Sequence, residues 1–183
     1  RASDSKVVCQ FQREIVMPLD NLAVEVAKSQ NFDARVRMSL RDIPIGEIIW
    51  GPFESYRGTV EPMEVDVFLN LSPRALWDKM TRGLWAVQNA LGANRDVMVE
   101  HGIACGASMF QLQFHCAARL GTPVVIQSSI RGRSDSSLRM QHVVTDARDS
   151  SILIEASYVL TFFNREAGSR ISMPSFILAA IDQ

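Results

Sequence analysis

The clearest hydrophobic pattern along the chain is a stripe of apolar residues at helical spacing. Its members recur every three or four residues and so share one face of a helix: Leu76, Met80, Leu84, Val87 and Leu91. Ser72 can cap the first turn with its hydroxyl, and Pro73 lacks the N–H that this turn would leave unpaired. Gly92 can take the left-handed conformation that ends many helices. The pattern predicts one long helix over residues 72–91.

Several other segments alternate between apolar and polar residues, which is typical of strands with one buried face. They are residues 63–69, 110–116, 124–130, 138–144 and 152–162. Stretches rich in Gly, Pro, Asp and Ser separate the last four segments and predict turns. One helix and five strands of this kind can bury each other's apolar faces. We therefore expect an α+β domain whose sheet wraps around one central helix.

Residues 1–61 follow a different pattern from the rest of the chain. Asp20 can cap a short helix over residues 22–27, and residues 36–40 alternate like a brief strand. Pro and Gly residues at positions 44–52 then predict short, irregular pieces. We expect an N-terminal extension, residues 1–61, that packs on the main domain or on a partner, and a main domain formed by residues 62–183.

Composition and charge exclude several classes of protein. The 183 residues are 47% hydrophobic and 21% charged, the proportions of a chain that folds around a packed core. The 19 basic and 20 acidic residues give a net charge of −1, so no strong positive field is available to bind nucleic acid. No apolar run approaches the roughly 20 residues of a membrane-spanning helix.

The cysteines Cys9, Cys105 and Cys116 are odd in number and lack the spacing of a zinc site. We therefore expect neither a disulfide framework nor a metal or other cofactor, and a reducing compartment fits best. The Arg-Ala-Ser start fits a trimmed chain and equally a mature form left after removal of a targeting peptide. For the second alternative, the hypothesis is a mitochondrial or plastid protein.

Two strings in the second half of the chain resemble a known family. Residues 113–124 are similar to a strand that ends in a Pro-Ala-x-x-Gly-Asp turn, with Cys116-Ala117 in place of Pro-Ala. Residues 159–168 are similar to a last strand with an Asp-Arg-Glu-Thr-Gly turn, and residues 171–174 to a Pro-containing exit.

The order of elements, a strand, a long helix and then further strands, adds to this resemblance. Together these features cover residues 62 to about 178 and resemble the hot-dog fold of acyl-CoA thioesterases, in particular the 4-hydroxybenzoyl-CoA-thioesterase-like enzymes. The resemblance implies an antiparallel sheet around the central helix. It also implies an oligomer with sites at subunit interfaces, where the helix start of one subunit faces its partner.

The helix start is where the chain departs from this family. Enzymes of the family have a Gly-His-Val-Asn-Asn element there, and a carboxylate that attacks the thioester or activates water. Residues 65–73 correspond to this element, contain no Gly-His pair and have Asp66 as their carboxylate. We take Asp66 as the candidate base or nucleophile and Asn70 as the candidate donor to the thioester oxygen. The structural alternatives are a solvated strand residue for Asp66 and a turn residue for Asn70.

Arg131 and Arg133 are the candidate binding residues for the phosphates of coenzyme A. Guanidinium groups make charge-assisted hydrogen bonds to phosphate. A charged turn between two strands is the alternative interpretation.

Two further groups have chemistry that a site could use. Glu100, His101 and Cys105 form a cluster of acid, imidazole and thiol, for which a strand edge with a buried thiol is the simpler interpretation. His142 falls on the core face of its strand, where a histidine is more often structural than catalytic.

Two hypotheses about function follow. The first is a thioesterase-like hot-dog protein, a homo-oligomer, that hydrolyses an acyl-CoA or acyl-carrier-protein thioester. The second is a catalytically inactive hot-dog domain that serves as a structural or interaction subunit of a larger assembly. The missing Gly-His-Val-Asn-Asn element favours the second, as do the apolar residues at positions 48–50 and 53 of the extension. A dehydratase of the same fold is less favoured, because no string matches its motif.

Overall fold

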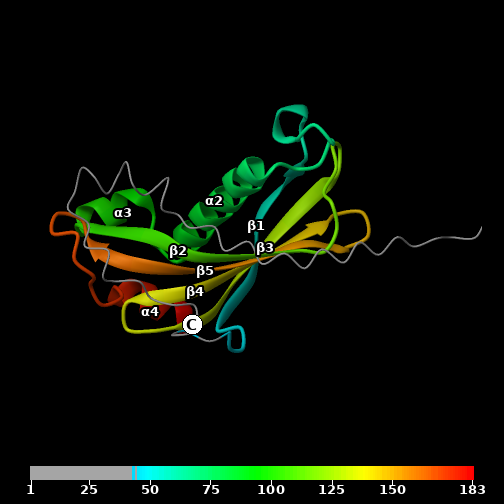
Figure 1. The fold of residues 1–183 in the computed structure, drawn as a ribbon. Helices are drawn as coiled ribbons and strands as arrows, with labels where there is room; N and C mark the ends of the chain where they lie inside the picture. The colour runs from blue at the N-terminus through cyan, green and yellow to red at the C-terminus, as the bar shows by residue number, and fades with distance from the viewer. Residues whose placement is uncertain (1–42, 44) are drawn as a thin grey trace, which may run out of the picture.

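The computed structural model describes residue 43 and residues 45–183. Its framework is a five-stranded sheet in the order β1-β3-β4-β5-β2, in which every neighbouring pair is antiparallel. The strands are β1 (Trp50–Thr59), β2 (Ile103–Phe114), β3 (Pro123–Arg133), β4 (Ser137–Asp146) and β5 (Ile152–Asn164). The long helix α2 (Pro73–Ala90) lies across one face of this sheet (Figure 1). The predicted antiparallel sheet around one long helix is confirmed.

Helix α2 begins and ends where its sequence signals place it. The Ser72 hydroxyl accepts a hydrogen bond from the Ala75 N–H (3.2 Å), and Pro73 occupies the first turn. Gly92 has a φ of 70°, the left-handed conformation expected after the last turn. Four members of the apolar stripe are buried and Leu84 is half-buried. Each fully buried large side chain contributes roughly 1.5–3 kcal/mol before chain entropy is subtracted.

The core has two clusters, one under each half of α2. Near the helix start, Leu76 and Met80 lie in a cluster with residues of β3, β4 and β5: Val124, Ile126, Val144 and Ile154. Near the helix end, Val87 and Leu91 lie in a second cluster with Ile130, Leu138, Met140 and Phe162. The predicted strands over residues 124–130, 138–144 and 152–162 therefore present the apolar faces that their alternation predicts. The predicted strand over residues 110–116 does so only in part, because β2 ends at Phe114, and Phe114 and Cys116 are exposed.

The predicted strand over residues 63–69 is wrong. The segment contains a short 3₁₀ helix, η1 (Pro62–Glu64), followed by a turn. Glu61 and Glu64 cap this helix reciprocally, each side chain meeting the other residue's backbone N–H, which favours a turn over an extended strand. Val65 packs against the core, whereas the other alternating apolar residues lie outside it: Met63 is 94%, Val67 90% and Leu69 54% exposed.

The first strand of the sheet is instead β1, which lies within the residues assigned to the extension. Strand β1 is at an edge of the sheet, and an edge strand tolerates a residue such as Pro52, which has no N–H. Gly51 has a φ of 86°, and a Cβ there would lie 2.8 Å from the Ser128 carbonyl oxygen. The prediction of irregular pieces is therefore wrong where it reaches into β1, from Trp50 onward.

The predicted short helix and strand of the extension lie outside the described residues. Residue 43 and residues 45–49 are described, and the N–H groups of Gly46 and Ile49 donate to the carbonyls of Arg131 and Ile130 on β3 (both 2.9 Å). How residues 1–42 pack, on the main domain or on a partner, stays a prediction.

The hydrophobic patterns do not predict two short helices, α3 (Arg95–Glu100) and α4 (Ser175–Ile181). Helix α3 depends on a local cap, because Asn94 Oδ1 accepts hydrogen bonds from the N–H groups of Asp96 and Val97. Helix α4 contributes Ile177 and Ile181 to the core. In the described part of the chain, no helix combines the length and the apolar character that crossing a membrane requires.

Candidate active site

The loop between η1 and α2 holds Asp66 by hydrogen bonds to its own backbone. Oxygen Oδ1 of Asp66 accepts from the N–H groups of Phe68 (2.9 Å) and Asn70 (3.0 Å). The Asp66 N–H donates to the Asn70 carbonyl (2.8 Å), which closes the loop. Among the described residues, the second oxygen, Oδ2, has no hydrogen-bond partner. Asp66 is therefore an exposed loop residue, not a strand residue, and Oδ2 can accept a proton from a bound molecule.

The same loop has a strained backbone that the neighbouring segment holds in place. Leu69 has a φ of 61°, and the left-handed conformation costs a residue with a Cβ roughly 1–2 kcal/mol. The Leu69 carbonyl accepts a hydrogen bond from the Leu120 N–H (2.9 Å), and the Leu71 N–H donates to the Ala118 carbonyl (2.7 Å). These bonds tie the loop to the segment that leads into β3.

Asn70 lies in the same loop as Asp66, and its backbone N–H donates to Asp66 Oδ1 (3.0 Å). It is half-buried, and its backbone forms a bridge with Arg119. Among the described residues, its side-chain amide has no hydrogen-bond partner. The amide N–H groups are available to donate to a carbonyl oxygen bound beside Asp66.

A buried lysine anchors the beginning of this loop. Lys79 of α2 is 2% exposed, and its Nζ lies 2.7 Å from Glu64 Oε1, 2.9 Å from the Tyr56 hydroxyl and 3.3 Å from the Thr59 carbonyl. We call these four residues the Lys79 cluster. Burial alone would lower the pKa of Lys79, but its hydrogen bonds to Glu64 and Tyr56 outweigh burial and raise it. Because Glu64 belongs to η1, the cluster joins β1, α2 and the Asp66 loop.

Exposed apolar residues lie on both sides of Asp66 in the chain. Val67 and Phe68 of the loop are 90% and 78% exposed, and Leu69 of the loop and Met63 of η1 are also exposed. An apolar surface of this kind suits contact with a ligand or with another protein chain.

Arg131 and Arg133 lie far from Asp66 within one chain. The Asn70–Arg119 bridge places the loop near Pro123 at the start of β3, whereas the two arginines lie at the end of β3. Arg131 is eight residues beyond Pro123, which corresponds to about 26 Å at roughly 3.3 Å per residue. One chain therefore does not bring the two predicted sets of site residues together.

Both arginines also have partners in the described part of the chain. Arg131 donates to the Gly46 carbonyl (2.8 Å) and to Gln141 Oε1 (2.9 Å). Arg133 forms an ion pair with Asp182 (2.7 Å) just after α4. These contacts fit the structural interpretation, and the role of the arginines in binding phosphates stays a prediction.

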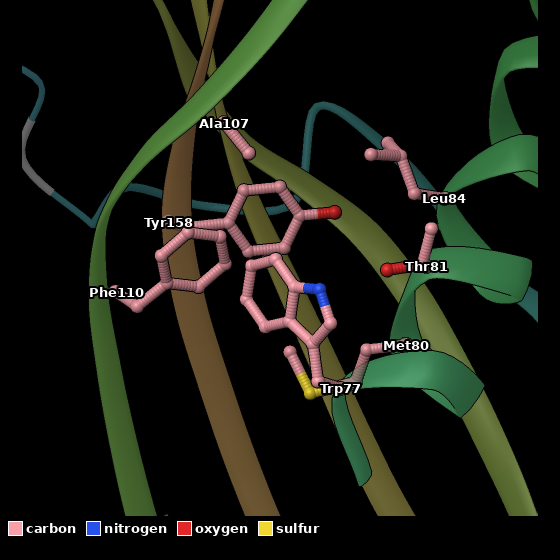
Figure 2. Close-up of a pocket in the computed structure, with 7 residues that line it drawn as sticks. All are labelled: Trp77, Met80, Thr81, Leu84, Ala107, Phe110 and Tyr158. Atoms are coloured by element: carbon pink, nitrogen blue, oxygen red, sulfur yellow. The ribbon is translucent and has the colours of Figure 1, made fainter. Parts of the chain in front are cut away.

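A small apolar pocket lies between α2, β2 and β5. Figure 2 shows the residues that line it, Trp77, Met80, Thr81, Leu84, Ala107, Phe110 and Tyr158. Its volume is about 20 Å³, which is close to what one water-sized group requires. The Phe110 ring stacks on Tyr158 with centroids 4.9 Å apart, and the Trp77 ring meets Phe110 edge-on at 4.4 Å.

Sequence patterns did not single out this pocket or the Lys79 cluster. Aromatic residues on strands and beside a helix stripe fit a core equally well, and lysine is usually exposed. The spacing of Trp77, Thr81 and Leu84 was the available signal, because positions i, i+4 and i+7 lie on one face of α2, beside Met80 of the main stripe.

The cluster of Glu100, His101 and Cys105 does not assemble a thiol site. The His101 ring packs against Phe176 at 5.5 Å, and Cys105 accepts a hydrogen bond from Gln88 on Sγ (2.8 Å). Burial raises the pKa of Cys105, which disfavours a reactive thiolate. Cys105 is on edge strand β2, as the simpler interpretation has it.

His142 is fully buried on the core face of β4. Burial lowers its pKa to about 4, so the imidazole is neutral near pH 7. No group of acidic, histidine and cysteine side chains suited to holding a metal ion occurs among residues 43 and 45–183.

No family model and no curated protein matches the chain by sequence. Its structure, however, is similar to solved structures. A 1,4-dihydroxy-2-naphthoyl-CoA thioesterase from Synechocystis superposes with a TM-score of 0.63 at 12% identity, over 70% of this chain and 94% of the other. A gentisyl-coenzyme A thioesterase gives 0.61 at 17% identity, over 69% and 98%.

A hypothetical protein from Staphylococcus aureus, solved in complex with CoA, gives a TM-score of 0.65 at 10% identity, over 69% of this chain and 79% of the other. At these identities the similarity shows the fold alone. The chain has the hot-dog fold, as the resemblance implied.

Proposed function

We propose that this protein hydrolyses an acyl-CoA or acyl-carrier-protein thioester, with Asp66 as the general base. The observation that carries the proposal is the geometry of Asp66, an exposed residue whose Oδ1 is held by two backbone N–H groups while Oδ2 has no partner among the described residues. The loop lies directly before α2, at the position where the resembling enzymes have their carboxylate. The two structural neighbours that are CoA thioesterases support the reaction class.

The reaction can be written with Asp66 and one water molecule. Asp66 Oδ2 removes a proton from water as the water oxygen attacks the thioester carbon. The carbonyl oxygen becomes an oxyanion, and the Asn70 amide donates a hydrogen bond to it. When the C–S bond breaks, Asp66 returns the proton to the leaving thiolate, so the products are a carboxylic acid and a free thiol.

We propose that the active form is a homo-oligomer. Asp66 and the two arginines lie at opposite ends of β3 in one chain, so in the proposed oligomer Arg131 or Arg133 of a second copy contacts the phosphates of the CoA whose thioester lies beside Asp66. Edge strand β2 leaves one row of backbone groups without a strand partner in the described sheet, which supplies a surface for pairing. Sedimentation equilibrium of the purified chain tests this part, and a monomer at micromolar concentration would contradict it.

The second candidate is a catalytically inactive subunit of a larger assembly. The exposed Val67 and Phe68 beside Asp66 favour it, because apolar side chains at a loop tip suit a protein interface. A mitochondrial or plastid location belongs to this proposal.

Thiol release separates the two candidates. We expect the wild-type chain to release free thiol from at least one member of a panel of acyl-CoA and acyl-carrier-protein thioesters, with kcat/KM reduced by about 10²-fold or more in Asp66→Asn. Asn70→Ala should lower kcat by a smaller factor. The matched control is Glu166→Gln, an exposed carboxylate in the turn after β5, which should keep wild-type activity. Silence across the panel, or full activity in Asp66→Asn, would reject the catalytic proposal.

A further inference from the structure

A chain of hydrogen bonds crosses the core beneath α2 and ends at the pocket. The Tyr158 hydroxyl lies 2.8 Å from His142 Nε2, and His142 Nδ1 lies 2.5 Å from Ser128 Oγ. Ser128 Oγ lies 2.6 Å from Ser55 Oγ, and the Ser55 hydroxyl donates to the Ile126 carbonyl (3.2 Å). All four side chains are more than nine-tenths buried. We call them the Tyr158 relay.

The carbonyl at the end of the relay sets the direction of every hydrogen bond in it. A carbonyl oxygen only accepts, so Ser55 gives its proton to Ile126 and must accept from Ser128. Ser128 then accepts from Nδ1–H of His142, which leaves Nε2 as the acceptor for the Tyr158 hydroxyl. A neutral imidazole, with one N–H and one lone pair, fits this order, and the lowered pKa of His142 agrees with it.

The fold makes specific room for the relay. The pairing of β1 with β3 shifts register between Glu54 and Tyr56, so Ser55 lies in a bulge. Gly83 of α2 lies over this point, and a Cβ there would lie 2.8 Å from Ser55 Oγ. Apolar side chains of similar size would fill the same space without the cost of burying polar groups. A bulge and a helix glycine that accommodate four polar side chains therefore indicate a role beyond packing.

The relay ends where the pocket begins. Figure 2 shows the Tyr158 hydroxyl, the Thr81 hydroxyl and the Trp77 ring nitrogen turned toward the same space between α2 and β2. Since the Tyr158 proton is committed to His142, the lone pairs of the Tyr158 oxygen are what this residue offers to the pocket. The remaining walls are apolar: Met80, Leu84, Ala107 and Phe110.

We propose that this pocket receives a hydroxyl-sized hydrogen-bond donor carried by an apolar ligand, and that Tyr158, oriented by the relay, is the residue that selects for the donor. A pocket of about 20 Å³ accepts a group the size of a hydroxyl, with the rest of the ligand toward the opening between α2 and β2. A ligand hydroxyl donates to the Tyr158 oxygen. A ketone in the same place would set its lone pairs against those of tyrosine. That the natural ligand is the acyl group of a thioester rests on the proposed function. The preference of the pocket for a hydroxyl over a ketone does not depend on that function.

The test compares cyclohexanol with cyclohexanone, which share a ring and an oxygen but differ in the O–H donor. Binding is followed by NMR titration of the Trp77 indole N–H, which Trp50→Phe and Trp85→Phe variants distinguish from the other two tryptophans. We expect cyclohexanol to bind about fivefold more tightly, the difference that one net hydrogen bond makes. Tyr158→Phe keeps the stacked ring and should bring the ratio close to one.

A variant remote from the pocket tests the relay itself. Ser55→Ala removes the acceptor for Ser128, so Ser128 satisfies its proton by donating to His142, and the order of the relay reverses. Tyr158 then offers its O–H to the pocket, and the preference should move toward cyclohexanone. The matched control is Ser129→Ala, a buried serine next along β3, which should leave the preference unchanged. Thermal unfolding confirms that each variant is folded.

Three results would overturn the proposal: tighter binding of cyclohexanone to the wild type, a preference for cyclohexanol that survives in Tyr158→Phe, or no change of the Trp77 signal with either probe. The outcome is separable from that of thiol release. A wild-type chain that releases no thiol but prefers the alcohol would reject only the proposed hydrolysis.

Discussion

The Lys79 cluster and the Tyr158 relay are two polar groups buried beneath the same helix. They differ in the charge of their basic residue, which is kept in the first and lost in the second. Lys79 stays charged because a carboxylate lies 2.7 Å away, and the pKa of the lysine is raised. Within the described structure His142 has serine and tyrosine hydroxyls as partners and no carboxylate, and burial lowers its pKa to about 4. A buried basic group keeps its charge when an acid is supplied, and gives it up when only neutral partners are available.

The position of each group explains the difference. The Lys79 cluster lies at the end of the core, where Glu64 belongs to a surface loop and keeps part of its side chain in water. The Tyr158 relay lies between α2 and the middle of the sheet, where a carboxylate would lose its hydration entirely. The charged cluster can anchor a loop, and the neutral relay can orient a hydroxyl.

The largest expected effect comes from breaking the charged cluster. Lys79→Met keeps the apolar stem but leaves Glu64 without its cation, and we expect a loss of about 3 kcal/mol in the free energy of unfolding, measured with urea. Lys79→Met combined with Glu64→Gln should recover part of this loss, because no unpaired charge is then left. If Lys79→Met alone were as stable as the wild type, the ion pair would not stabilise the fold.

Acid should weaken the neutral relay. An unfolded histidine titrates near pH 6.5 and folded His142 near pH 4, so between these values only the unfolded chain binds the proton. Stability should be full above pH 6.5 and fall by up to about 3 kcal/mol as the pH drops toward 4.

Urea unfolding of the wild type and of His142→Gln between pH 4 and pH 7 measures this. His142→Gln should lose less stability than the wild type between pH 7 and pH 4. If the unfolding free energies of both proteins fell equally with pH, His142 would not be the group responsible. The pKa of Glu64 is lowered from 4.5, so its contribution is lost only at lower pH, and the two windows are separable.

Closing the space above the relay should have an intermediate effect. Gly83→Ala places a Cβ 2.8 Å from Ser55 Oγ, and we expect destabilisation of about 1–2 kcal/mol despite the better helix propensity of alanine. Adding Ser55→Ala should remove most of this penalty, as a double-mutant cycle of unfolding free energies would show. Gly106→Ala is the control, because its Cβ meets only Phe163 at an ordinary 3.5 Å. Additive effects of the two substitutions would contradict the proposed contact.

The smallest effect should come from removing one neutral partner of Lys79. Tyr56→Phe deletes the hydroxyl that accepts from Nζ at 2.9 Å but leaves Glu64 and the Thr59 carbonyl in place. We expect a loss of about 1 kcal/mol by thermal or urea unfolding. A loss as large as that of Lys79→Met would mean that the hydroxyl, and not the carboxylate, is the main partner.

Elements with local signals could be predicted, and elements without them could not. Helix α2 has its cap at Ser72 and its stop at Gly92, and both act within one turn of the chain. Strand β1 contains Gly51 and Pro52, which argue against a strand until its place at the sheet edge is known. Residues 63–69 alternate correctly but lie outside the sheet, because Asp66 and Glu64 satisfy the local backbone as a turn.

The residues of the candidate site also differ in whether a local sequence signal marks them. Asp66 could be selected because its place before a long helix is visible in the sequence. Lys79 and Tyr158 could not, since each depends on partners 14 or more residues away that only folding brings near. Arg131 and Arg133 were grouped with Asp66 by chemistry, and the length of β3 separates them.

By itself, the sequence determined the class of fold, because apolar periodicity specifies which face of each element must be buried and so which layers can form. It also determined the helix that the sheet surrounds. Only the tertiary structure decided which polar groups became charged anchors and which became neutral relays. Burial and the identity of distant partners set the protonation of a side chain, and neither is present in the order of residues along the chain.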